Sequence, residues 1–129
     1  MRRIGFILAL VFLSACMKPI TPDMIASPTT LTPAQKTHLE AGIRTGLKDP
    51  GSAQFGELAA AIDSNGLLSA CGYVNAKDEF GDYTGKKPFM GRFTGATQSN
   101  FVVEAIGRDE ITAGAVLGLC HRLGIENWR

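Results

Sequence analysis

The sequence has little of several features that mark common classes of protein. It carries 13 lysines and arginines against 12 acidic residues, so its net charge is +1. It therefore lacks the excess of basic residues that nucleic-acid-binding proteins use to contact phosphates. Three cysteines and two histidines occur without CxxC or paired-histidine spacing, which argues against a metal site. The main apolar run, Ile4 to Leu13, is shorter than the roughly 20 residues that span a bilayer. We therefore expect no nucleic acid, no metal and no transmembrane helix.

The N-terminus has the three parts of a secretory signal peptide. Arg2 and Arg3 are the charged start, the apolar run follows, and the small residues Ser14 and Ala15 lead into Cys16. Residues 1–15 are therefore predicted to be a signal peptide. Its removal would take away both arginines, leaving 11 basic residues against 12 acidic ones in a nearly neutral mature chain.

The segment Leu13-Ser14-Ala15-Cys16 resembles the lipobox of bacterial lipoproteins. The resemblance implies that Cys16 carries lipid, palmitate among its acyl chains, and becomes the first mature residue. Two or three acyl chains hold a protein stably on a membrane. Met17 follows where an aspartate would favour retention in the inner membrane, so the resemblance implies a periplasm-facing protein of the outer membrane.

The remaining chain divides into a tether and one small domain. Residues 16–32 are rich in proline and threonine and predict a flexible tether, and residues 33–129 predict a single domain. With Cys16 taken by lipid, Cys71 and Cys120 remain as an even pair, which an oxidising envelope compartment favours as a disulfide bond. A pair of buried free thiols is the alternative.

Two helices are predicted at the ends of this domain. Thr32, Pro33 and Gln35 form a capping box that starts the first helix, and Lys48-Asp49-Pro50 ends it. Asp109 caps the second helix, 110–123, whose inward face is expected to hold the following residues: Ile111, Ala115, Val116, Leu119, Cys120 and Leu123. Gly114 and Gly118 are expected to let this helix approach the sheet closely.

Four strands are predicted between the helices. Apolar alternation changes parity near Gly56-Glu57, which indicates a β-bulge in the first strand, and Asp63-Ser64-Asn65-Gly66 predicts a hairpin turn. The others lie around 67–77, 88–94 and 101–105, with a charged loop from Asp78 to Lys87. Successive hairpins indicate an α+β domain, with an antiparallel sheet of about four strands and both helices packed on one face.

Two central segments carry a second resemblance. Leu47 to Phe55 reads LKDPGSAQF, and Cys71 to Gly85 reads CGYVNAKDEFGDYTG. They resemble a set of small proteobacterial envelope and phage-associated proteins with the motifs LKDPxSAxF and CGxVNAKNxxGGYxG. This chain departs from the pattern at Asp78 and Asp82, where the family has Asn and Gly. The resemblance implies an envelope location and no particular activity.

No catalytic constellation is recognisable, and we expect no enzyme activity and no cofactor. The serines lack a nucleophile-elbow pattern, and His121 diverges from Cys120 on its helix. Asp78, Glu79 and Asp82 gather in one loop but lack the spacing of an EF-hand, so a solvated acidic turn is the simpler interpretation.

A binding role remains. Aromatic and polar side chains surround the central strand–loop–strand region, as in protein interfaces; they are Tyr73, Asn75, Lys77, Tyr83 and Phe89. The alternative is that Tyr73 and Phe89 belong to the core. We therefore expect a lipid-anchored envelope protein with a non-enzymatic binding or accessory role toward a protein or glycan. The other candidates are an inhibitor of a hydrolase, whose cleft the loop would fill, and a phage-type surface lipoprotein that blocks superinfection.

Overall fold

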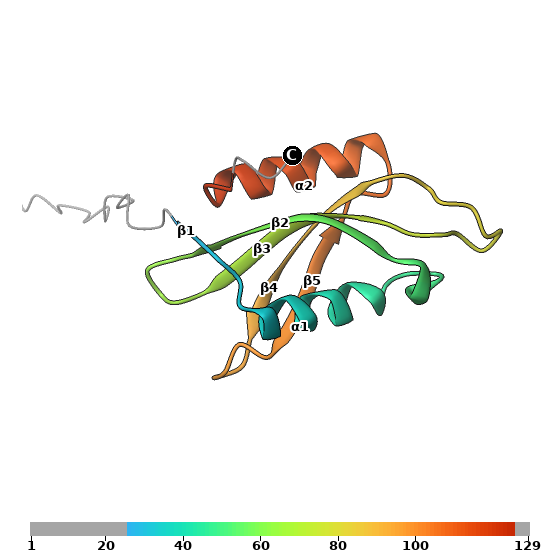
Figure 1. Ribbon diagram of the computed structural model, residues 1–129. Coiled ribbons are helices and arrows are strands. Elements are labelled where there is room, and N and C mark those ends of the chain that lie inside the picture. Colours follow the sequence, from blue (N-terminus) through green and yellow to red (C-terminus); the bar gives the residue numbers. More distant parts are fainter. Residues whose placement is uncertain (1–25, 126–129) are drawn as a thin grey trace, which may run out of the picture.

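A computed structural model describes residues 26–125 as a three-layered α+β domain (Figure 1). The elements in chain order are β1 Ser27–Thr29, α1 Pro33–Arg44, the 3-10 helix η2 Pro50–Ser52, β2 Gln54–Ile62, β3 Leu68–Asn75, β4 Lys87–Thr94, β5 Asn100–Ile106 and α2 Glu110–Arg122. Each strand pairs antiparallel with the next, in the order β1-β2-β3-β4-β5. The predicted α+β class is confirmed.

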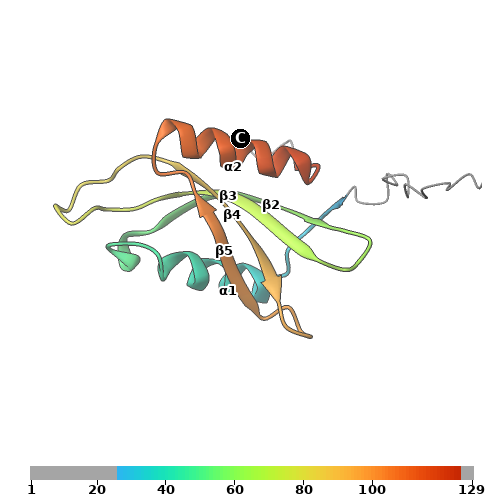
Figure 2. The same cartoon turned by 180° about the vertical axis from the view of Figure 1, so that it is seen from behind.

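The two helices cover opposite faces of the sheet, so the expectation that both pack on one face is wrong (Figures 1 and 2). The central strand β3 explains the error, because both of its faces are buried. Leu68, Ala70 and Val74 point to the α1 side, whereas Cys71 points to the α2 side. Small residues such as Ser69 and Cys71 weaken the sequence signal of a second buried face.

Each face has its own hydrophobic core. The core under α1 contains mostly large residues, namely Leu31, Leu39, Ile43, Ala60, Leu68, Ala70, Val74, Phe89, Phe93 and Phe101. The core under α2 is smaller and is made of Ala26, Ala61, Cys71, Met90, Val116, Cys120 and Ile125. The predicted disulfide is confirmed: Cys71 and Cys120 are bonded, and both are fully buried.

The sheet has five strands rather than four. The additional strand, β1, pairs with the end of β2 and lies in the segment expected to be part of the tether. Its Ser-Pro-Thr sequence has no apolar alternation, but Ala26 and Leu31 on either side are buried. These residues therefore belong to the folded domain. The predicted signal peptide and Cys16 lie outside the described residues.

Local signals for α1 and β2 are confirmed. The Thr32 hydroxyl accepts a hydrogen bond from the Gln35 amide at 3.1 Å, and the Gln35 side chain accepts one from the Thr32 amide at 2.9 Å. The register of β2 on β3 shifts between Phe55 and Leu58, at the predicted bulge. Gly66 closes the following turn with a φ of 80°. The helix itself ends at Arg44, earlier than the Lys48-Asp49-Pro50 stop.

Helix α2 begins as predicted but is rotated relative to the expected face. Asp109 caps it, and Val116 and Cys120 point inward. Ile111 is 86% exposed and Leu119 40% exposed, however, and a Cβ on Gly114 or Gly118 would meet nothing within 4 Å. The helix is positioned instead by Ala113, which packs tightly on Gly107. A Cβ added to Gly107 would lie 2.4 Å from the Ala113 Cα. No helix within residues 26–125 is long and apolar enough to cross a membrane.

Candidate functional site

The loop between β3 and β4 extends beyond the end of the sheet in both views (Figures 1 and 2). It continues the hairpin instead of opening into irregular chain. Lys77 and Tyr83 form an antiparallel bridge, and the Thr84 amide donates to the Ala76 carbonyl at 3.2 Å. Nearer the tip, the Asp78 amide donates to the Asp82 carbonyl at 2.9 Å. The loop is therefore held in one conformation by its own backbone.

The acidic residues of this loop shape its turn. The Asp78 carboxylate accepts hydrogen bonds from the amides of Phe80 and Asp82, at 2.9 and 3.1 Å. Glu79 lies 3.9 Å from the Lys48 ammonium, and both side chains are largely exposed. Within residues 26–125 no three His, Cys, Asp or Glu side chains are grouped so as to hold a metal ion. These contacts assign Asp78 a structural role in the turn.

Tyr83 and Lys77 tie the loop to η2. The Tyr83 hydroxyl donates to the Ser52 carbonyl at 3.1 Å, and the Lys77 amide donates to the Ser52 hydroxyl at 2.8 Å. The Lys77 ammonium lies over the Tyr83 ring, 5.5 Å from its centroid, where a cation–π attraction operates. Asn75 adds a further tie, because its side-chain oxygen accepts from the Gly85 amide at 3.0 Å.

The five residues predicted to form a binding surface do not all gather at one place. Asn75, Lys77 and Tyr83 meet around the base of the loop. Tyr73 is partly buried on the α2 side of the sheet. Phe89 is fully buried in the core under α1, so its assignment to a surface is corrected. Alternation along β4 places the Phe89 side chain on the face covered by α1, where the centroid of its ring lies 6.4 Å from that of the Phe55 ring.

A cavity of about 300 Å³ opens beside the base of this loop, on the α1 side of the sheet. We call it the basic pocket. Its walls are apolar where they are formed by Leu47, Val74, Ala76 and Ile106. Four cationic residues also line it, namely Lys48, Lys77, Lys87 and Arg108. Asp78 is the one carboxylate among the lining residues, and its oxygen is engaged in the turn.

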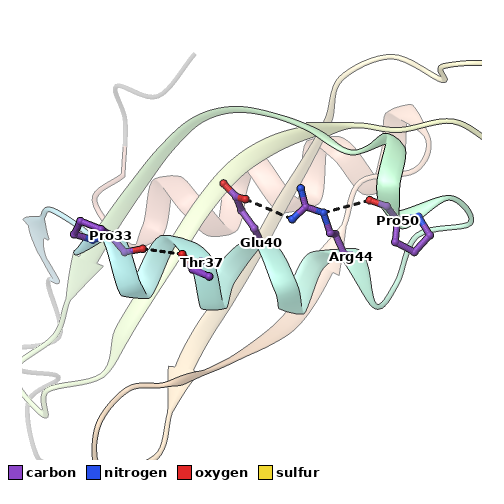
Figure 3. A network of polar contacts seen from close by, with 5 residues as sticks. All are labelled: Pro33, Thr37, Glu40, Arg44 and Pro50. Atoms are coloured by element: carbon purple, nitrogen blue, oxygen red, sulfur yellow. Dashed lines mark hydrogen bonds and ion pairs between the residues drawn. The ribbon is translucent and has the colours of Figure 1, made fainter.

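The wall formed by Leu47 and Lys48 is fixed by an arginine of α1. Figure 3 shows Arg44 between Glu40 and Pro50: its guanidinium lies 3.5 Å from the Glu40 carboxylate and donates to the Pro50 carbonyl at 3.2 Å. The same guanidinium lies 5.1 Å from the centroid of the Phe55 ring. Arg44 thereby connects the end of α1 to η2 and restrains the segment between them, which supplies Leu47 and Lys48.

The opposite wall is fixed by Lys87. Its ammonium donates to the Arg108 carbonyl at 3.2 Å, which joins the start of β4 to the segment before α2. Lys87 also helps to lower the pKa of Asp109, although the main cause is the hydrogen bond from the Thr112 amide. Four cationic residues thus line one pocket in a chain whose total charge is +1.

Of the four cations, sequence reasoning assigned only Lys77 to a binding surface. Lys48, Lys87 and Arg108 come from separate segments, and apart from the pair Lys86-Lys87 none of them has a basic neighbour in the sequence. The signal is their shared position at one end of the sheet, which depends on strand register and on the path of the chain after α1.

Comparison with known proteins adds no relative: no family model, no curated protein and no solved structure matches this chain. The two resemblances noted in the sequence therefore remain predictions.

Proposed function

We propose that the protein is a lipid-anchored component of the bacterial cell envelope whose domain is a non-enzymatic binding module. The module takes an anionic ligand that also has an apolar part. The anchor is Cys16, and the outer membrane, with the domain facing the periplasm, is the location that Met17 favours. The lipobox-like Leu13-Ser14-Ala15-Cys16 supports the anchor.

The observation that carries the binding role is the basic pocket. Apolar walls favour burial of an apolar group, and a few polar or charged groups at the edge of a cleft fix the orientation of a ligand. Four cations around one small cavity attract negative charge and raise the local concentration of an anion. The volume of about 300 Å³ is at the lower end of the range for small-molecule sites, which suits a small ligand or one side chain of a larger partner.

A binding role agrees better with the lining than catalysis does. General acid–base or nucleophilic chemistry requires a reactive group within hydrogen-bonding distance of a base. Apart from the four cations, the polar side chains that line the pocket are those of Asp78 and Thr84. Both are used by the loop: the Asp78 carboxylate accepts hydrogen bonds in the turn, and the Thr84 hydroxyl donates to the Ala76 carbonyl at 3.4 Å.

The pocket is tested with two fluorescent dyes that differ in charge. We expect the anionic dye 1-anilinonaphthalene-8-sulfonate to bind the purified protein, and the double variant Lys87→Ala/Arg108→Ala to weaken that binding about tenfold, since each of two partly exposed charges contributes about 0.5–1 kcal/mol. The neutral dye N-phenyl-1-naphthylamine should lose much less affinity.

Lys86→Ala is the matched control, because Lys86 is exposed, neighbours Lys87 in sequence and does not line the pocket. An equal loss with Lys86→Ala, or an equal loss for the neutral dye, would contradict a charge-selective site.

The anchor is tested separately by intact mass spectrometry of protein extracted from its native membrane. We expect a mass for residues 16–129 plus acyl chains, and a gain of two hydrogens after reduction of the Cys71–Cys120 bond. A mass that includes residues 1–15, or that lacks the acyl chains, would overturn the anchor and leave the pocket proposal standing.

A further inference from the structure

The tip of the β3–β4 loop carries a side chain that the fold leaves uncovered. Phe80 is 81% exposed, although its backbone is fixed by the bond from its amide to the Asp78 carboxylate. A large apolar side chain on a loop of fixed shape can act as an anchor that fills a pocket of a partner. Three carboxylates surround it in sequence, those of Asp78, Glu79 and Asp82.

The loop tip has the chemistry that the basic pocket accepts. It offers one apolar ring together with negative charge, and the pocket offers apolar walls together with four cations. Phe80 does not fill the pocket of its own chain, since most of its surface is exposed. The loop tip and the basic pocket are therefore complementary in chemistry, but Phe80 does not occupy the pocket of its own chain.

We propose that the protein forms a reciprocal dimer in which Phe80 of each copy enters the basic pocket of the other. This inference rests on the proposed function, since it uses the same pocket and names its occupant as a second copy of the chain. In the dimer, the carboxylates of Glu79 and Asp82 face the cations around the partner's pocket.

The position of the loop allows both contacts to form at once. Lys77, Asp78 and Thr84 belong to the loop and also line the pocket, so the donor and acceptor surfaces are adjacent on one end of the molecule. A two-fold axis between two such ends brings each tip to the other pocket, which gives a closed, isologous interface. Little conformational entropy is lost on association, because the hydrogen bonds of the loop already fix its shape.

Two other interactions of the loop compete with the proposed dimer. Glu79 contacts Lys48 of its own chain at 3.9 Å, but both side chains are largely exposed, and such pairs contribute little. The second is insertion of the loop into the cleft of a hydrolase. The match between the charges of the loop and those of the pocket favours the second copy.

Sedimentation equilibrium of the full-length protein in a mild non-ionic detergent measures this association. We expect the mass to rise to that of a dimer with concentration, and the dissociation constant to increase at about 1 M salt, where charges are screened within about 3 Å. Phe80→Ala should weaken association at least about tenfold, which is a modest effect for an interface anchor.

Leu67→Ala is the control, because Leu67 is 39% exposed in the β2–β3 turn at the opposite end of the sheet (Figure 1). The control should associate as the parent does.

A charge exchange makes the test specific. One variant carries Glu79→Lys and Asp82→Lys, so that its loop and pocket are both positive. The other carries Lys48→Glu, Lys87→Glu and Arg108→Glu, so that three of the four pocket cations become anionic and its loop and pocket are both negative. Each alone should be monomeric and should keep the circular dichroism spectrum of the folded parent. An equimolar mixture should form a heterodimer, because both of its contacts then join opposite charges.

A parent that is monomeric at every concentration, a Phe80→Ala variant that associates normally, or a mixture that stays monomeric would each overturn the inference. If the anionic dye still binds in those cases, the pocket remains a ligand site and the proposed function survives. If the dye binding also fails, both fall.

Discussion

Cys71 and Cys120 are bonded across 6.3 Å between their Cα atoms, joining the central strand of the sheet to the helix on one of its faces. The helix on the other face, α1, is held by packing of Leu39 and Ile43 instead. The core under α2 is made largely of small residues, so it buries less apolar area for each contact. The covalent bond is thus found on the face where packing is weaker.

Removal of the disulfide should weaken the fold substantially. The bond closes a sequence separation of 49 residues, and the double variant Cys71→Ala/Cys120→Ala should lower the free energy of unfolding by about 2–4 kcal/mol. Urea unfolding followed by circular dichroism measures the loss. Hydrogen exchange should increase more in α2 than in α1. An unchanged unfolding midpoint would show that packing alone fixes α2.

Features that depend on neighbouring residues were predictable from the sequence. The Thr32–Gln35 capping box, the Asp109 cap, the turn at Gly66 and the bulge after Phe55 are all present. Each rests on hydrogen bonds or backbone angles within a few residues, which residue type largely decides. The pairing of Cys71 with Cys120 was predicted by count, on the expectation that Cys16 is taken by lipid.

Features that depend on distant residues were not predictable. Strand β1 forms because its backbone completes the edge of β2, and its side chains carry no signal of this. The side of α2 that faces the sheet is set by Ala113 on Gly107 and by the disulfide, which a helical wheel does not contain. The basic pocket was missed for the same reason, since its cations converge only in the folded chain.

The outward face of α2 leads to a stabilising substitution. A Cβ at Gly118 would meet nothing within 4 Å, and alanine is better than glycine in a helix by about 0.5–1 kcal/mol. Gly118→Ala should therefore raise the free energy of unfolding by about that amount, measured in urea. A loss of stability would indicate that Gly118 packs on the sheet, as the sequence had suggested.

Gly91 should respond in the opposite way. It lies at a register shift between β4 and β5, and a Cβ there would stand 2.3 Å from the Val102 carbonyl oxygen and 2.5 Å from the Phe101 ring. Because the first obstacle is backbone, the strands must separate, and Gly91→Ala should lower the free energy of unfolding by about 1–3 kcal/mol. The same urea experiment compares it with Gly118→Ala, and equal effects would contradict the close approach.

Tyr83 should act on the loop through its hydroxyl. Tyr83→Phe removes the bond to the Ser52 carbonyl but keeps the ring beneath Lys77. We expect a loss of about 0.5–1.5 kcal/mol in local stability, seen as faster hydrogen exchange at the amides of Asp78 and Thr84. Exchange at the β2–β3 turn is the internal control and should not change. Tyr83→Ala should increase exchange further, and equal rates in both variants would assign the effect to the hydroxyl alone.

Stability in acid should depend on Asp109. Hydrogen bonds from Thr112, first from its amide and then from its side chain, lower the pKa of this exposed carboxyl below its ordinary value of 3.8. Because the folded-state pKa is the lower one, the unfolded chain binds the proton first as the pH falls. The stabilisation by the ionised cap is therefore complete above pH 3.8 and is lost as the pH falls through the folded-state pKa.

Comparison with Asp109→Asn tests this dependence, since asparagine can still cap the helix but carries no charge that favours its N-terminus. In urea unfolding, the parent should be more stable than Asp109→Asn at neutral pH, and the difference should shrink as the pH falls below 3.8 and the carboxyl of the folded protein takes up its proton. Thr32→Ala at the start of α1 is the control: it also removes a cap, at a cost of about 1 kcal/mol, but through a group that does not titrate. Its effect should stay the same across the pH range. A constant difference for Asp109→Asn as well would mean that the carboxylate charge contributes nothing to α2, and that the cap acts through hydrogen-bond geometry alone.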